Sequence, residues 1–179
     1  MPDSLFRGRL VRLTAPRPED TETMARWSEN STYSRLVDTD YARPRPAKAF
    51  AEKEDETPPA DALEFRIRTI AEDRLVGFVA LHHIEWSNGS GEISIGIGEP
   101  ADWDKGYGSE AMRLTLNYAF NELNLHRVGL DVLDYNARAL HVYEKLGFVH
   151  EGAKRQFGRR DGRRYDLVLM GMLRDEWKG

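Results

Sequence analysis

Hydrophobic and polar residues alternate along several short stretches of this chain, a pattern typical of β-strands with one buried face. The stretches that alternate are residues 9–14, 63–70, 75–84, 92–97, 126–133 and 164–172. A glycine-rich segment at 87–91 predicts a hairpin turn between the third and fourth of them. Because short connections join the three stretches between 63 and 97, we expect an antiparallel meander there.

Apolar residues three and four positions apart predict helices elsewhere in the chain. The expected helices cover residues 19–29, 107–122 and 136–146. Between residues 30 and 59 prolines interrupt the pattern, and an acidic run at 52–56 predicts a short solvated helix in a mobile loop. An antiparallel start followed by alternating strands and helices predicts an α/β fold, with a mixed, mostly antiparallel sheet of six to seven strands and helices on both faces.

Length and composition narrow the class of protein. A chain of 179 residues has the ordinary size of one domain, so we expect a single domain over residues 1–179. The chain has no cysteine, which excludes disulfides, thiolate metal ligands and an acyl group held on cysteine. Its formal net charge is −4, and no apolar run approaches the roughly 18 residues that span a bilayer. We therefore expect a cytoplasmic protein whose partners include neither nucleic acid nor membrane.

A glycine-containing turn precedes the second expected helix. The residues from Asp104 to Ala111 read Asp-Lys-Gly-Tyr-Gly-Ser-Glu-Ala, between a strand and a helix. Glycines let backbone amides approach a ligand closely, and the amino end of a helix favours negative charge. The hydroxyl of Ser109 and the charge of Lys105 add to this preference, so the turn predicts a phosphate site.

The same turn also fits a dinucleotide-binding fingerprint. Gly106, Gly108 and Ala111 satisfy Gly-x-Gly-x-x-Ala, and Asp131 lies near the spacing of an acidic ribose ligand. That fingerprint requires a tight strand-to-helix turn, whereas seven residues separate Ile97 from Lys105. The remaining chain is also short for two mononucleotide-binding halves, so we disfavour this alternative.

The third expected helix carries a longer pattern. From Asn136 to Phe148 the chain reads Asn-x-x-Ala-x-x-x-Tyr-x-x-x-Gly-Phe, about 25 residues after the glycine turn. The two patterns together resemble the GNAT superfamily of N-acetyltransferases, in particular the branch with spermidine N-acetyltransferases and N-terminal acetyltransferases of ribosomal proteins. The resemblance runs from Arg9 to Trp177 and is densest between Gly91 and Gly152. It implies a GNAT-like fold and direct transfer of an acetyl group from acetyl-CoA to a primary amine.

The resemblance also implies where acetyl-CoA binds. The pyrophosphate would rest on the loop around Trp103–Gly108, and the pantetheine arm would pair with the strand edge at Ile95–Ile97, where Gly96 leaves room for it. The implied contacts are Ile95, Gly96, Ile97, Trp103, Lys105, Gly106, Tyr107, Gly108, Ser109, Asn136 and Ala139. Trp103 replaces the Arg or Gln that is usual in the family. Asp104 stands where many relatives have glycine, and its charge predicts weaker coenzyme binding unless the carboxylate faces solvent.

Two residues are candidates for proton transfer. Tyr143 matches the family's general acid, and a tyrosine holds its proton at neutral pH because its reference pKa is about 10. The base is less well defined: Glu92 or a water chain would take the amine proton. His82 and His83 are expected on opposite faces of a strand, and the His-His-x-Glu spacing that ends at Glu85 matches no zinc signature, so we expect no metal.

The amine acceptor has the weakest sequence signal. The family arrangement implies contacts in the loop around residues 27–33 and at the acidic stretch 52–56, and the candidates are Trp27, Glu29, Tyr33 and Glu85. The acceptor classes left open are polyamines, other small amines and protein or peptide N-termini. A non-catalytic acyl-CoA-binding or sensory domain of the same fold is the alternative function, and a homodimer is possible for either.

Overall fold

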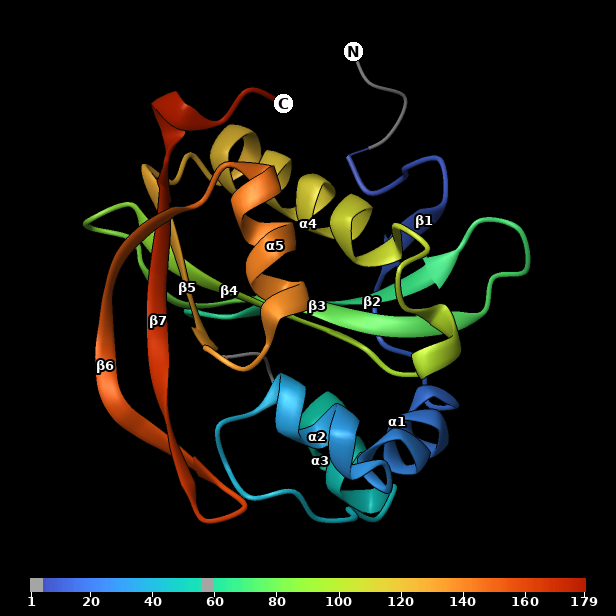
Figure 1. Cartoon of the computed structure of the whole chain (residues 1–179). Coiled ribbons are helices and arrows are strands. Elements are labelled where there is room, and N and C mark those ends of the chain that lie inside the picture. Colours follow the sequence, from blue (N-terminus) through green and yellow to red (C-terminus); the bar gives the residue numbers. More distant parts are fainter. Residues whose placement is uncertain (1–4, 56–59) are drawn as a thin grey trace.

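The computed structural model describes residues 5–55 and 60–179 of the chain (Figure 1). Its centre is a seven-stranded sheet with the order β1-β2-β3-β4-β5-β7-β6. The strands are β1 (Val11–Thr14), β2 (Leu63–Thr69), β3 (Leu75–Glu85), β4 (Ser90–Ile97), β5 (Arg127–Leu133), β6 (Val149–Arg160) and β7 (Arg163–Leu173). Neighbouring strands are antiparallel except β4 and β5, which pair in parallel. The expected α/β class with a mixed, mostly antiparallel sheet is therefore confirmed.

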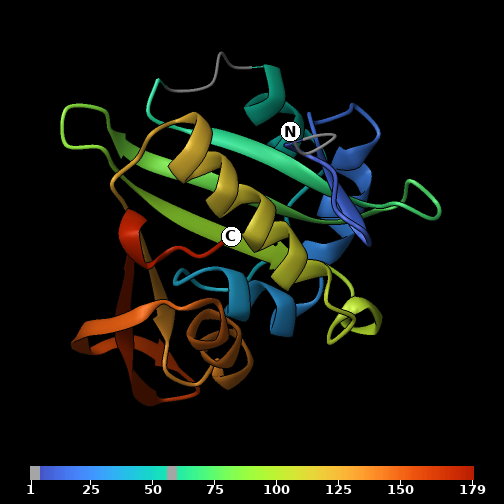
Figure 2. The same ribbon diagram turned by 90° about the horizontal axis from the view of Figure 1, so that it is seen from above.

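Helices cover both faces of this sheet. They are α1 (Asp20–Ser28), α2 (Ser31–Val37), α3 (Lys48–Asp55), α4 (Tyr107–Asn117) and α5 (Ala137–Leu146). Figures 1 and 2 show α4 and α5 on one face and the first three helices on the other. None of the helices in the described part of the chain is long and apolar enough to cross a membrane.

Most of the expected elements are present, with two corrections to the helices. The region 30–59 contains two helices, α2 and α3, where one was expected; the side chains of the acidic run at 52–56 lie outside the described residues. The helix expected to Glu122 ends at Asn117 and continues as one π-helical turn, Tyr118–Glu122. Antiparallel pairing of β2, β3 and β4 also excludes the doubly wound parallel sheet of a dinucleotide-binding fold.

The first strand begins two residues later than its alternation suggests. The carboxylate of Glu110 on α4 accepts hydrogen bonds from the backbone amides of Arg9, Leu10 and Val11, at 3.0, 2.7 and 2.8 Å. Those amides are therefore committed to α4 rather than to a strand partner.

The hydrophobic core lies mainly between the sheet and α4. Fully buried side chains there include Ile67, Val79, Leu81, Leu116 and Phe120. A smaller cluster on the other face joins Met24 and Trp27 of α1 to Tyr33 and Leu75. The two clusters hold the helices at fixed positions above and below the middle strands, where the candidate site lies.

A buried ion pair joins α1 to β2. Asp20 is 2% exposed and accepts a hydrogen bond of 2.9 Å from the Arg17 amide, while its other oxygen pairs with the guanidinium of Arg68. Removing the carboxylate leaves the buried Arg68 charge without its partner, which typically costs about 3–5 kcal/mol. We therefore predict that Asp20→Ala lowers the free energy of unfolding by about that amount, measured by urea denaturation.

The exposed Asp175 supplies the control for this prediction. Asp175→Ala should change the free energy of unfolding by no more than about 0.5 kcal/mol, as expected for a surface position. Equal effects of the two substitutions would contradict a structural role for the buried pair.

Candidate active site

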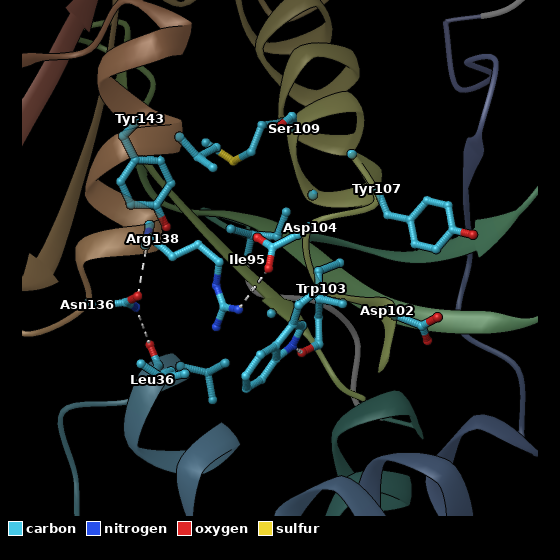
Figure 3. Close-up of a pocket in the computed structure, with 18 of the residues that line it drawn as sticks. Leu36, Ile95, Asp102, Trp103, Asp104, Tyr107, Ser109, Asn136, Arg138 and Tyr143 are labelled. Carbon is cyan, nitrogen blue, oxygen red and sulfur yellow. Dashed lines mark hydrogen bonds and ion pairs between the residues drawn. The ribbon is translucent and has the colours of Figure 1, made fainter. Parts of the chain in front are cut away.

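The candidate site lies where two central strands separate. Pairing between β4 and β5 is limited to Ser90–Glu92 against Arg127–Gly129. Beyond that point a pocket with a cavity volume of about 160 Å³ opens beside β4. Its walls come from β4, from the glycine turn and α4, from α5 and from α2 (Figure 3). Strands joined at one end and separated at the other thus leave an opening through the sheet.

The glycine turn forms one end of the pocket. Gly106 has φ 84°, in the left-handed region that favours glycine, and no side chain of the described residues caps the first turn of α4. The amides of Tyr107, Gly108 and Ser109 therefore begin the helix without a side-chain acceptor, and all three residues line the pocket. Such amides together with the helix dipole bind anions, so this end fits the diphosphate of a coenzyme.

Lys105, which the sequence analysis assigned to the coenzyme, is not among the residues that line this pocket. Its ammonium lies 3.4 Å from a carboxylate oxygen of Asp102, which also accepts hydrogen bonds of 2.7 and 2.8 Å from Arg74. These donors hold the pKa of Asp102 below its ordinary value. The positive charge of Lys105 is therefore directed to Asp102.

Arg138 of α5 supplies a cation that the sequence analysis missed. Its guanidinium lies 3.9 Å from the ring centroid of Trp103 and 3.8 Å from a carboxylate oxygen of Asp104. Figure 3 shows these three side chains together at the mouth of the pocket. The Asp104 side chain is 77% exposed, so its charge is balanced by Arg138 and by solvent. The indole N–H of Trp103 donates to the carbonyl of Ile97 at 2.9 Å and so ties the turn to the end of β4.

Gly96 lines the pocket, but the space beside it is already filled. A Cβ atom at Gly96 would lie 2.6 Å from Phe78, 2.9 Å from Val37 and 3.2 Å from the hydroxyl of Tyr33. The expectation that Gly96 leaves room for the coenzyme arm was therefore wrong. The glycine instead allows α2 to pack closely on β4, while Ile95 and Ile97 present apolar side chains to the pocket.

Asn136 joins the start of α5 to the end of α2. Its side-chain oxygen accepts from the Ala139 amide at 3.3 Å and caps α5, and its amide nitrogen donates to the Leu36 carbonyl at 3.4 Å. Both Asn136 and Ala139 line the pocket, as the sequence predicted. The cap therefore fixes the start of α5 against the end of α2.

Tyr143 lies about two turns after Asn136 along α5. Its ring packs against Phe148 with centroids 6.0 Å apart, and Figure 3 shows its hydroxyl directed toward the other lining residues. Burial, and to a smaller extent the carboxylate of Asp131, raise the pKa of this hydroxyl to about 12. The group therefore holds its proton through the neutral and mildly alkaline range.

Glu92 lies outside the pocket and contacts two histidines. Its carboxylate oxygen is 3.1 Å from Nδ1 of His83 and 3.7 Å from Nδ1 of His82. The expectation that the histidines face opposite sides of the strand was wrong, because their Nδ1 atoms are 3.3 Å apart. His82 lines a groove that adjoins the pocket at Tyr33 and Val37.

Of the four candidate acceptor residues, one lies at the openings. Tyr33 lines both the pocket and the adjoining groove. Trp27 is 2% exposed and donates to Glu99 at 3.1 Å, so it belongs to the core. Glu29 is exposed after α1 and lines neither opening, and Glu85 accepts from Asn88 at 2.7 Å within the β3–β4 turn. The assignments of Trp27, Glu29 and Glu85 to the acceptor site are therefore corrected.

Several lining residues carried no sequence signal. Those that the sequence analysis did not assign to the pocket are Leu36, Val37, Asp102, Met112, Arg138 and Val142. The apolar residues in this set follow helical spacing, as core residues do, so the sequence does not mark them as pocket residues. They line the pocket because α2, α4 and α5, which are far apart in sequence, come together around it.

Comparison with known proteins identifies the family. The family described as Acetyltransferase (GNAT) domain matches residues 10–149, so the chain belongs to the GNAT acetyltransferases. The resemblance found in the sequence is thereby confirmed.

Its relatives include enzymes that act on amines. The chain is 35% identical over 107 residues to a spermidine N(1)-acetyltransferase of Vibrio cholerae and 34% identical over 105 residues to the putative ribosomal N-acetyltransferase YdaF of Bacillus subtilis. These alignments cover 60% and 59% of this chain and 61% and 57% of the relatives. A solved structure of spermidine N-acetyltransferase from Vibrio cholerae with CoA and spermine has a TM-score of 0.83 at 25% identity, covering 93% of this chain and 96% of that one.

The glycine at the start of α4 provides a test of the pocket. A Cβ atom at Gly108 would lie 3.6 Å from Ile97 and 3.8 Å from Ile95, so a larger side chain enters the pocket rather than the core. We predict that Gly108→Val weakens CoA binding, measured by calorimetry, by about 10- to 100-fold, because overpacking costs about 1–3 kcal/mol.

Ala153→Val on the exposed strand β6 is the matched control and should leave CoA affinity unchanged. A folded Gly108→Val protein that binds CoA as tightly as the wild type would place the coenzyme elsewhere.

Proposed function

We propose that the protein is an acetyl-CoA-dependent N-acetyltransferase that acetylates a primary amine by direct transfer. One observation carries the proposal: a single pocket holds both the uncapped amides of the glycine turn and the hydroxyl of Tyr143. A pocket used only for binding would need the first feature and not the second.

The lining residues fit acetyl-CoA at each part of the coenzyme. The amides of Tyr107–Ser109 would hold the diphosphate, with Arg138 as the nearby cation. The apolar side chains of Ile95, Ile97 and Ala139 would contact the arm. Acetyl-CoA supplies an acetyl thioester when bound.

Tyr143 would serve as the general acid. A leaving thiolate needs a proton, and the Tyr143 hydroxyl keeps one because its pKa is raised to about 12. On the acceptor side, an alkylammonium has a reference pKa near about 10 and must lose a proton before it attacks. Glu92 or ordered water would take that proton, as the sequence suggested.

The acceptor would reach the pocket through the adjoining groove. Among its lining residues are the acidic Asp38, Asp40 and Glu64 and the basic Arg43, Arg45 and Arg66. A groove of mixed charge suits a cationic amine without selecting among polyamines, other small amines and peptide N-termini. The relatives' printed substrates make polyamines and ribosomal proteins the first acceptors to examine. A cytoplasmic location, where acetyl-CoA is available, goes with this proposal.

An acceptor screen tests the function directly. The full chain is incubated with acetyl-CoA and with polyamines, aminoglycosides, amino acids or peptides, and free CoA is measured with a thiol reagent, which reports only the coenzyme because the chain has no cysteine. Acceptor-dependent release establishes the transferase. Binding of CoA without release for any acceptor would favour the non-catalytic acyl-CoA-binding alternative.

Removal of one hydroxyl tests the proposed acid. Tyr143→Phe keeps the ring packing against Phe148 and removes only the proton donor, so CoA affinity should survive while kcat falls by about 10²-fold. The lower end of the usual range applies because a thiol leaving group is itself fairly acidic, with a pKa of about 8.5.

The rates are compared over pH with the best acceptor from the screen. Because the pKa of Tyr143 is raised to about 12, the wild-type rate should not fall between about pH 8 and 10 through loss of this proton. Tyr165→Phe, which removes a hydroxyl outside the pocket, is the control and should retain the wild-type rate. Equal rates for Tyr143→Phe and wild type would exclude Tyr143 from the chemistry.

A further inference from the structure

A β-bulge brings two consecutive histidines to the same side of β3. His82 pairs with Glu92 and Glu85 pairs with Ser90, so two residues of β3 stand opposite one residue of β4. A regular strand would direct neighbouring side chains to opposite faces, whereas a bulge re-aims them. His83 has φ 49°, a left-handed conformation that is uncommon for a residue other than glycine. The chain therefore adopts an unfavourable backbone conformation where the two imidazoles meet.

Three potential ligand atoms converge at this bulge. Nδ1 of His82 and Nδ1 of His83 are 3.3 Å apart, and Oε2 of Glu92 lies 3.7 and 3.1 Å from them. A point equidistant from three atoms with these separations lies about 2.0 Å from each, which matches Zn–N and Zn–O bonds of about 2.0–2.2 Å. A metal ion near that point therefore lies within bonding distance of all three atoms.

The surroundings also favour a cation. Burial lowers the pKa of His82, and the neighbouring His83 lowers it too; the carboxylates of Glu92, Asp131 and Asp61 act against this shift and place negative charge near the imidazole. The His83 side chain is 73% exposed and that of Glu92 is 49% exposed, so the cluster opens to solvent. A site with three protein ligands and an open side keeps a position for water or another small ligand.

We propose that His82, His83 and Glu92 form a binding site for a divalent transition-metal ion, with Zn²⁺ the best match to two imidazoles and one carboxylate. Imidazole ligands select Zn²⁺, Ni²⁺, Co²⁺ or Cu²⁺ over Mg²⁺ and Ca²⁺. The third ligand comes from the neighbouring strand, which explains why the spacing His-His-x-Glu gave no zinc signature. The site is separate from the coenzyme pocket and does not depend on the proposed acetyl transfer.

Calorimetric titration with ZnCl₂ tests the site. The full chain is used after removal of any purification tag and of chelator. Wild type should bind one Zn²⁺ per chain, and His83→Gly and Glu92→Gln should each weaken binding by at least about tenfold, since even a supporting residue around a metal is worth 10- to 100-fold. Glycine accepts the left-handed φ at position 83, so this variant should unfold at the same or a higher temperature than wild type.

His150→Gln is the matched control. His150 and Glu144 form another histidine–carboxylate contact, at 2.9 Å, that has no third ligand among the described residues, so its loss should not change the affinity for Zn²⁺. With Co²⁺ in place of Zn²⁺, wild type should develop the visible absorption of a low-symmetry tetrahedral complex, and His83→Gly should not. Absence of Zn²⁺ binding to wild type, or equal binding by wild type and His83→Gly, would overturn the proposal.

Discussion

The separation of β5 from β4 after Glu92 is the constraint on which the rest of the site depends. Helix α2 maintains it from one side: Val37 and Tyr33 pack against the bare backbone of Gly96. The far end of β5 is held to the same helix, since the Tyr135 hydroxyl donates to the Arg35 carbonyl. Two strands fastened to one short helix can neither close onto each other nor move far apart. The pocket is thus a consequence of packing, formed before any ligand binds.

The anion-binding end of this pocket relies on backbone amides more than on charged side chains. The nearest lysine, Lys105, is paired with Asp102, a carboxylate that is 3% exposed and already bound to Arg74. Arg138 is shared between Trp103 and Asp104. Backbone amides at the start of a helix are already oriented to bind a diphosphate. Lys105 and Arg138, in contrast, would have to weaken the contacts that they already make. The glycines of the turn therefore matter more for this end than its basic residues.

The sequence predicted the strands and the two helices beside the pocket because period and capping are local properties. The pattern from Asn136 to Phe148 also pointed to Asn136 and Tyr143 as site residues, and both line the pocket. Sequence reasoning failed where the outcome depends on contacts between distant segments. Trp27 resembled an exposed acceptor ligand, yet it is buried because Gly98 leaves space for its ring: a Cβ atom there would lie 2.0 Å from the indole. Lys105 resembled a phosphate ligand, and nothing near it in sequence indicates that Asp102 is buried and available.

The bulge in β3 shows how one extra residue changes the chemistry of its neighbours. Without it Glu92 would have only its cross-strand partner His82 beside it. With it, one oxygen of Glu92 faces two imidazole nitrogens. The proposed base and the proposed metal ligand are then the same oxygen, and a lone pair given to a metal ion is unavailable to a proton. Glu92 therefore cannot bind a metal ion and accept a proton at the same time. If Glu92, rather than water, takes the amine proton, a bound metal ion would slow acetyl transfer.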